Sequence, residues 1–228
     1  MVFTTTLFTY FFFPIAVALW LLGKFIDKRI KTRGGADVVL IVISIIFFGW
    51  NNIKIIWWLI IFIGSVYVLG LLIEQANING NKKITRIALM AGVGILLILL
   101  GYYKYSAFSI QILNQIFKSN IVVQNIVTPL GISFITFTAI SYLADIYNEK
   151  ANAGSLLDCA LYISFFPKLI SGPIVLWRDF SLQVRARTIQ IERVYEGIRR
   201  ITYGFVKKLI LADTFGSIFE YCADILYI

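Results

Sequence analysis

Histidine is absent from this chain of 228 residues, which removes the commonest general base and the commonest metal ligand. A serine nucleophile activated by histidine is therefore excluded within this stretch. The glycines form neither a GxGxxG nor a Walker pattern, so no phosphate-binding loop is predicted. The chain has two cysteines, Cys159 and Cys222, and both lie in apolar runs, which favours core or lipid-facing thiols over a disulfide. No metal site and no bound cofactor are expected.

Charge is also scarce, and this decides the class of protein. Charged residues make up 14% of the chain and hydrophobic residues 59%, whereas a soluble domain is about a quarter charged and about half apolar. The composition predicts an all-α, polytopic transmembrane helical bundle, with residues 1–228 as a single membrane domain. The net charge of +9 comes from basic residues between apolar runs. That pattern is typical of loops that face the cytoplasm and anionic membrane lipid, not of nucleic-acid binding.

Apolar runs predict four spans in the first half of the chain. They are Leu7–Leu22, which lacks basic residues before it and so indicates a retained span, then Val38–Trp50, Ile53–Ile73 and Ile87–Tyr102. The basic loops Gly23–Asp37 and Glu74–Arg86 are expected in the cytoplasm, which puts the N-terminus outside. Tyr103–Val127 is less apolar, and part of it is expected to lie flat on the membrane.

The stretch from Pro129 to Phe180 combines helix breakers with ionisable groups in an apolar setting. Asp145, Asp158 and Lys168 lie within or beside its apolar runs, and Ser155 with Asp158 has the spacing of a capping box. Ionisable groups at membrane depth are unfavourable by roughly 2.5–3.5 kcal/mol each. Broken backbone is tolerated there only against protein or a watery cavity. A polar pocket or channel is therefore predicted here.

Charge also predicts that this stretch reverses direction. Arginines become frequent after Pro173, and a full crossing by Leu156–Ile170 would place them outside, against the positive-inside rule. We therefore expect a broken, re-entrant segment near Pro167–Pro173, with both ends on the cytoplasmic side. Lys168, Ser171 and Pro173 are candidates to line a substrate tunnel, with Lys168 meeting an anionic group. The alternative is a plain kink whose lysine snorkels to the headgroups.

Thr138, Ser141 and Asp145 fall at positions i, i+3 and i+7 of one helical face. Thr138 and Asp145 are further tunnel candidates. The alternatives are interhelical hydrogen bonding by the hydroxyls, and a water-exposed helix end for Asp145.

Beyond Pro173 the spacing predicts an amphipathic interfacial helix that runs into Leu209–Cys222. Its apolar stripe is Val194, Ile198, Ile201, Phe205 and Leu209, and its opposite face is Glu192, Glu196, Arg199, Tyr203 and Lys207. The arginines between Arg178 and Arg200 favour a lipid-facing surface, with a cytoplasmic anionic donor such as coenzyme A as the alternative partner.

Several blocks of the chain resemble the membrane-bound O-acyltransferase (MBOAT) family, in its alginate O-acetyltransferase and teichoic acid D-alanyl-transfer branch. The blocks are MVFTTTLFTYFFFPIAVAL at the start, LGYYKYSAF at Leu100–Phe108, PLGISFITFTAISYLADIY at Pro129–Tyr147, LLDCALYISFFPKLISGPIVLWRDF at Leu156–Phe180 and EGIRRITYGFVKKLILADTF at Glu196–Phe215. The resemblance implies acyl transfer from a thioester such as acetyl-CoA to a hydroxyl of a cell-surface polysaccharide. It also implies a bacterial plasma membrane location and an extracytoplasmic acetyl-transfer partner protein.

The family's catalytic histidine has no counterpart in this chain, so no catalytic residue can be assigned. We expect the N-terminal part of a longer enzyme whose catalytic C-terminal part is missing, and the chain alone is expected to be inactive. Two other classes stay open. A transporter or channel would show an inverted pair of interrupted helices, of which only one unit is visible, and a non-catalytic remnant or scaffold would suit the missing histidine.

Overall fold

The computed structural model describes residues 5–30, 34–50, 52–118, 128–169, 172–185 and 189–226. All regular elements within these ranges are helical, which confirms the predicted all-α class. The chain separates into two compact units, Ile15–Arg185 and a second unit made of Met1–Pro14 with Ala186–Ile228. Each unit is described by itself below.

Within the described ranges, three helical stretches are long and apolar enough to cross a membrane. They are Phe8–Ile30, made of the π-helical turn η1 (Phe8–Phe12) and α1 (Phe13–Ile30), then α3 (Lys54–Ile78) and α4 (Lys82–Phe117). Two further apolar helices, α2 (Gly35–Gly49) and α5 (Ile132–Tyr147), are shorter. At 1.5 Å per residue each is about 23 Å long, less than the hydrocarbon core of about 30 Å.

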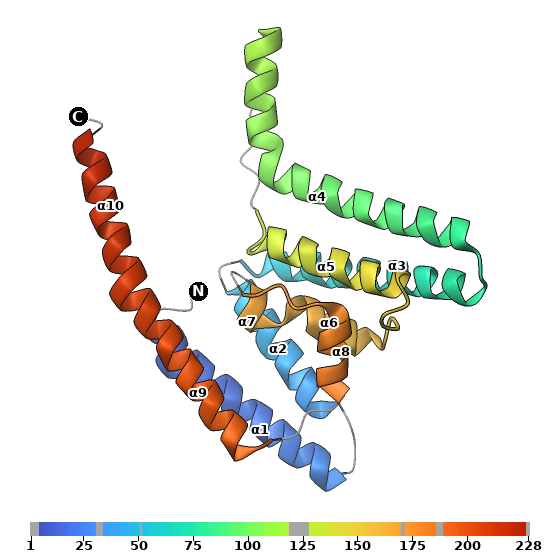
Figure 1. Ribbon diagram of the computed structural model, residues 1–228, viewed down its shortest axis with the longest axis horizontal. Helices are drawn as coiled ribbons and strands as arrows, with labels where there is room; N and C mark the ends of the chain where they lie inside the picture. Colours follow the sequence, from blue (N-terminus) through green and yellow to red (C-terminus); the bar gives the residue numbers. More distant parts are fainter. Residues whose placement is uncertain are drawn as a thin grey trace. The chain divides into compact units, whose positions relative to one another are not determined.

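Two predicted boundaries are wrong. The expected loop Glu74–Arg86 is mostly helical, because α3 continues to Ile78 and α4 begins at Lys82. Only Asn79–Asn81 connects them, with Gly80 at a φ of 69° and the Asn81 side chain accepting a hydrogen bond from Ile84 N. The predicted fourth span and the start of the expected interfacial stretch form one 36-residue helix, α4, which bends partway along (Figure 1). Charged and amide side chains are compatible with a helix, so hydropathy locates apolar runs better than helix ends.

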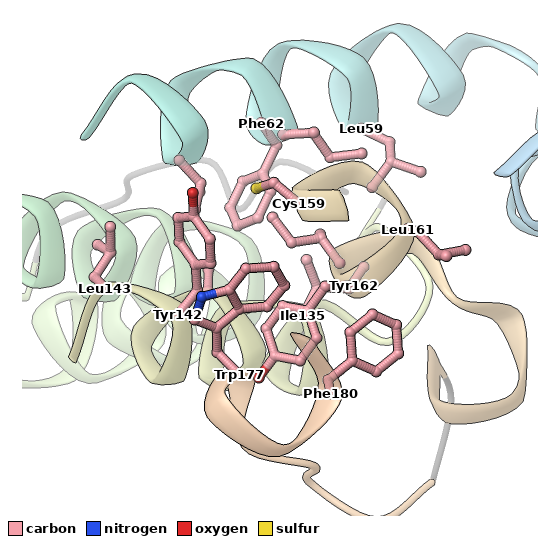
Figure 2. Packing of buried hydrophobic residues seen from close by; sticks show 14 of the residues in the cluster. Leu59, Phe62, Ile135, Tyr142, Leu143, Cys159, Leu161, Tyr162, Trp177 and Phe180 are labelled. Atoms are coloured by element: carbon pink, nitrogen blue, oxygen red, sulfur yellow. The ribbon is translucent and has the colours of Figure 1, made fainter. Parts of the chain in front are cut away.

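Helix α5 lies in the core of the larger unit, packed against α3 and α4 (Figure 1). Tyr142 and Leu143 on α5 are fully buried (Figure 2). A Cβ atom at Gly70 of α3 would lie 2.5 Å from the Tyr142 ring, and one at Gly92 of α4 would lie 3.0 Å from Leu143. These two glycines therefore permit the close packing of both helices on α5.

Helices α6 (Leu156–Ser164), α7 (Phe166–Leu169) and α8 (Trp177–Arg185) follow. The predicted capping box is confirmed, since Ser155 and Asp158 exchange both of its hydrogen bonds. The break comes at Phe165, whose ψ of 106° ends α6 before Pro167 is reached. A proline ring clashes with the carbonyl four residues earlier in a continuing helix, so the backbone leaves the helix ahead of it.

In the second unit, α9 (Ile191–Val206), η2 (Lys207–Ala212) and α10 (Asp213–Leu226) follow one another as helix. The predicted helix after Pro173 is thus confirmed. Neither α9 nor η2 has a buried residue in this structure. Within α9 the Glu196 and Arg200 side chains form an ion pair at 2.6 Å, one turn apart.

Candidate functional site in the α6–α8 hairpin

Residues 155–185 fold back on themselves, and we call them the α6–α8 hairpin. The Trp177 indole N–H, at the start of α8, donates to the carbonyl of Asn152, just before α6, at 2.9 Å. A second bond joins the two arms of the hairpin, because the Tyr162 hydroxyl on α6 donates to the Val175 carbonyl, just before α8, at 2.7 Å. The chain therefore returns to the level at which α6 began. The predicted reversal is confirmed as geometry, and the side of the membrane on which it opens stays a prediction.

The loop of residues 148–155, between α5 and α6, is held by side chains from other helices. The Ala153 N–H donates to Glu74 Oε1 of α3 at 3.2 Å. The Ala153 carbonyl accepts from the Tyr142 hydroxyl of α5 at 2.9 Å. Nearby, the Asn77 amide of α3 donates to the Ile146 carbonyl at 2.9 Å. These bonds fix the end of α5 and the entry to the hairpin, since buried backbone groups need such partners.

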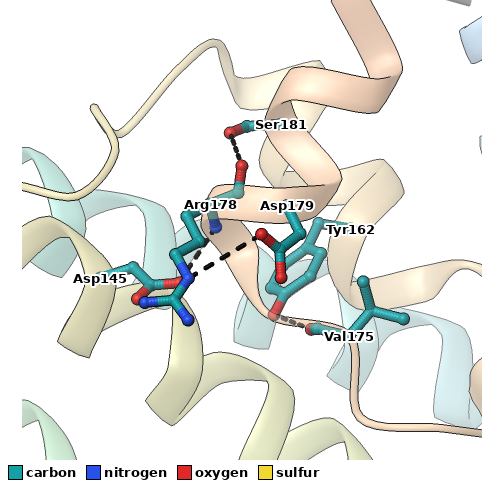
Figure 3. Close-up of polar contacts among 6 residues, drawn as sticks. All are labelled: Asp145, Tyr162, Val175, Arg178, Asp179 and Ser181. Carbon is teal, nitrogen blue, oxygen red and sulfur yellow. Dashed lines mark hydrogen bonds and ion pairs between the residues drawn. The ribbon is translucent and has the colours of Figure 1, made fainter.

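Asp145 joins α5 to α8. Its Oδ2 accepts a hydrogen bond from the Arg178 backbone N–H at 3.0 Å (Figure 3). Arg178 lies in the first turn of α8, where helix N–H groups lack partners within the helix and a carboxylate is favourable. Asp145 does lie near the end of α5, but the alternative in which water reaches it there is wrong, because the residue is only 6% exposed.

Four aromatic rings from α5, α6 and α8, those of Tyr142, Tyr162, Trp177 and Phe180, pack together (Figure 2). The ring centroids of Tyr142 and Trp177 are 5.0 Å apart, and those of Tyr162 and Trp177 are also 5.0 Å apart. Tyr162 and Phe180 are 5.1 Å apart. These separations are typical of favourable aromatic pairs, and the rings give the interior of the hairpin a low-dielectric lining.

Lys168 of α7 points into this aromatic cluster. Its residue is 7% exposed, and its Nζ lies 3.5 Å from the centroid of the Tyr162 ring and 5.2 Å from that of Phe180. Within the described part of the chain Nζ has no hydrogen-bond partner. The alternative in which Lys168 snorkels to headgroups is therefore wrong, because the ammonium is enclosed by protein. Instead it makes a cation–π contact.

The other sequence candidates are placed differently. Thr138 is buried on α5, and the neighbouring Ser141 Oγ is buried without a hydrogen-bond partner among the described residues. Pro173 is exposed, and Ser171 lies outside the described residues. Among the sequence candidates, the structure gives the most detailed contacts for Lys168 and Asp145. The tunnel that the candidates are predicted to line stays a prediction.

Sequence reasoning missed the residues that hold the site together. Glu74 and Asn77 lie at the end of an apolar helix, and an acid in that position was an available signal. No such sequence signal marked Tyr162, Trp177 and Phe180, since aromatic residues in apolar runs are common in any membrane helix.

Long apolar helices and a reversed, ionisable hairpin define a helical membrane protein. Over 97% of its length the chain is 34% identical to the probable alginate O-acetylase AlgI of Pseudomonas aeruginosa, covering 42% of that protein. It is 30% identical over 98% of its length to the peptidoglycan O-acetyltransferase of Helicobacter pylori, covering 47% of it. A shorter match, 27% identical over 41% of the chain, is to the teichoic acid D-alanyltransferase of Streptococcus thermophilus.

These matches confirm the resemblance to the membrane-bound O-acyltransferase family, and those that extend over nearly the whole chain are to alginate and peptidoglycan O-acetyltransferases. The chain spans less than half the length of the alginate and peptidoglycan relatives, 42% and 47% of the two described above. No family model and no solved structure matches it.

Proposed function

We propose that this chain is part of a membrane-bound O-acyltransferase. It moves an acetyl or similar acyl group from a thioester donor, such as acetyl-CoA, to a hydroxyl of a cell-surface polysaccharide. The observation that carries the proposal is the similarity to alginate and peptidoglycan O-acetyltransferases over nearly the whole chain. The enclosed Lys168 and buried Asp145 of the α6–α8 hairpin support a specialised site at this point of the fold.

The reaction needs a base that these residues do not supply. The acceptor oxygen attacks the thioester carbonyl carbon, the C–S bond breaks, and the hydroxyl proton passes to a base, which typically accelerates such steps about 10²–10⁴-fold. Histidine is absent from the 228 residues, and the Asp145 carboxylate already accepts a hydrogen bond from Arg178 N. In this proposal the base lies outside these residues. Their own part is to build the tunnel, with Thr138, Asp145, Lys168, Ser171 and Pro173 as its candidate lining.

The proposal includes a multi-pass location in a bacterial plasma membrane, with the N-terminus outside and the α6–α8 hairpin opening to the cytoplasm. An extracytoplasmic partner protein would assist delivery to the polysaccharide. Single cysteines at Lys82 and Arg185 test this topology. Both should react only with a membrane-permeant maleimide, and labelling at Arg185 by an impermeant maleimide in intact cells contradicts a re-entrant hairpin.

The function is tested by deleting the gene in its host and measuring ester-linked acetyl groups on the cell-surface polysaccharide. We expect these esters to fall to background and to return with a plasmid copy. Membranes from the complemented strain should also transfer label from acetyl-CoA to added polysaccharide. Unchanged ester content together with no transfer in membranes would contradict the enzyme and favour a scaffold or a transporter.

The isolated 228-residue chain is a separate test of the missing base. Purified in detergent with acetyl-CoA and polysaccharide, it should give no turnover above a protein-free blank. Turnover by this chain alone would mean that a residue within it takes the proton, and Asp145→Asn would then be the first variant to assay.

A further inference from the structure

The amino group of Lys168 is enclosed by protein and has no polar partner in the described part of the chain. Burying an ammonium is unfavourable unless it is paired. The cation–π contact with the Tyr162 ring offsets only part of this penalty. A group held at such a disadvantage is typically kept for an interaction that the resting state does not show.

The carboxylates around the α6–α8 hairpin are engaged elsewhere. Asp145 accepts from the Arg178 backbone N–H, and Asp179 lies 3.8 Å from the Arg178 guanidinium (Figure 3). Asp158 closes the capping box with Ser155. None of the three is paired with Lys168, so its amino group remains free to interact with an incoming group.

We propose that Lys168 stabilises the oxyanion that forms on the thioester carbonyl oxygen during acyl transfer, a role that rests on the proposed function. When the acceptor oxygen bonds to the carbonyl carbon, the C=O π pair moves onto oxygen and creates one negative charge. The hydroxyl proton passes to a carboxylate or imidazole base. Collapse of this intermediate restores the carbonyl, breaks the C–S bond and releases the thiolate, which takes up a proton from the base.

The enclosed, unpaired state of Lys168 suits this task better than permanent binding of an anion. One ammonium balances the single charge of the oxyanion. A cation already paired with a fixed anion would interact equally before and during the reaction, whereas only interactions that strengthen in the transition state raise kcat. The aromatic rings of Tyr162 and Phe180 keep water away and make such a charge more effective.

The segment after α7 packs on the backbone of Lys168. Gly172 is packed so closely on it that an added Cβ atom would lie 2.3 Å from Lys168 Cα. The next two residues, Pro173 and Ile174, are exposed. Lys168 therefore lies next to an exposed part of the segment that leads back to α8.

A binding experiment tests the role without turnover. The probes are two acetyl-CoA analogues, one with a singly charged tetrahedral phosphonate and one with a neutral ketone in place of the thioester carbonyl. The protein from its own gene, purified in detergent, should bind the phosphonate at least ~10²-fold more tightly than the ketone, in line with the loss seen on removing one oxyanion donor. Lys168→Met should abolish this preference, and the matched exposed variant Lys207→Met should retain it.

Kinetics separate this role from ordinary anion binding. Lys168→Met should lower kcat by about 10²–10³-fold with KM unchanged, and Lys168→Arg should restore part of kcat. A raised KM with normal kcat would overturn the proposal, as would equal binding of the two analogues by the unmodified protein or a preference that survives in Lys168→Met. If the protein prefers the phosphonate but transfers no acyl group to polysaccharide, the role of Lys168 is supported. The acceptor class of the proposed function is then contradicted.

Discussion

The α6–α8 hairpin and the helix of α9 to α10 differ in how they are held. The hairpin is held by bonds from two other helices, since Ser44 Oγ of α2 accepts from Phe166 N and Asp145 of α5 accepts from Arg178 N. The loop that leads into it is held by Glu74 of α3, which accepts from Ala153 N. By contrast, α9 and η2 bury no residue in this structure. Substitutions of the same chemical kind should therefore have unequal effects in the two regions, because the free energy of unfolding depends on the contacts that are lost.

The largest difference is expected for truncated aromatic rings. Trp177→Ala removes a fully buried ring and its bond to Asn152, and should lower the free energy of unfolding by about 3–5 kcal/mol. Its matched control, Phe219→Ala in α10, removes a ring that is 73% exposed and should change it by less than about 0.5 kcal/mol. Unfolding of the detergent-purified chain, followed by circular dichroism, measures both. Equal losses would show that α10 packs as firmly as the hairpin.

Removal of a carboxylate charge should give the next largest contrast. Asp145→Asn weakens a buried, charge-assisted hydrogen bond to Arg178 N and should lower the free energy of unfolding by about 1.5–3 kcal/mol. Asp213→Asn removes an exposed carboxylate in contact with Lys208 and should change it by less than about 1 kcal/mol. The same unfolding measurement applies. If Asp145→Asn leaves the free energy of unfolding unchanged, the bond from Asp145 to Arg178 N does not hold α8 in place.

Alanine at two glycines should act in opposite directions. At Gly172 the new Cβ would lie 2.3 Å from Lys168 Cα, so the backbone must shift, with a loss of about 1–3 kcal/mol. At Gly216, within α10, the new Cβ meets nothing within 4 Å, and the helix should gain about 0.5–1 kcal/mol. Midpoints of thermal unfolding should therefore fall for the first variant and rise for the second. A stabilising Gly172→Ala would contradict the tight packing of Gly172 on the Lys168 backbone.

The smallest effect on stability is expected at Lys168. Lys168→Met keeps the apolar stem and removes an unpaired buried charge, so the free energy of unfolding should rise by on the order of 1 kcal/mol. The exposed Lys207→Met is the control and should be neutral. A stabilised variant with impaired transfer would separate the role of Lys168 in the reaction from any role in folding. A strongly destabilised variant would identify Lys168 as structural.

Local signals predicted the helices and one of their caps. Apolar runs indicated the membrane helices, and the three-residue spacing of Ser155 and Asp158 gave the cap of α6, because both patterns depend on residues within a turn or two. Charge distribution predicted the reversal after α6, since arginines beyond Pro173 and the positive-inside rule leave few alternatives. The helix ends around Asn79–Asn81 were misplaced, because charged residues extend helices as readily as they form loops.

The sequence by itself therefore determined that this is a helical membrane protein with a broken, reversed segment and related it to the O-acyltransferases. Only the tertiary structure decided which groups meet inside that segment. Asp145 and Arg178 are 33 residues apart, and Trp177 and Asn152 are 25 apart, separations at which no helical periodicity relates two side chains. The enclosure of Lys168 against Tyr162 and Phe180 likewise depends on how α6, α7 and α8 pack. Burial and pairing are properties of the folded chain. A lysine between two prolines in the sequence is therefore compatible with either a structural kink or a functional site until its neighbours are known.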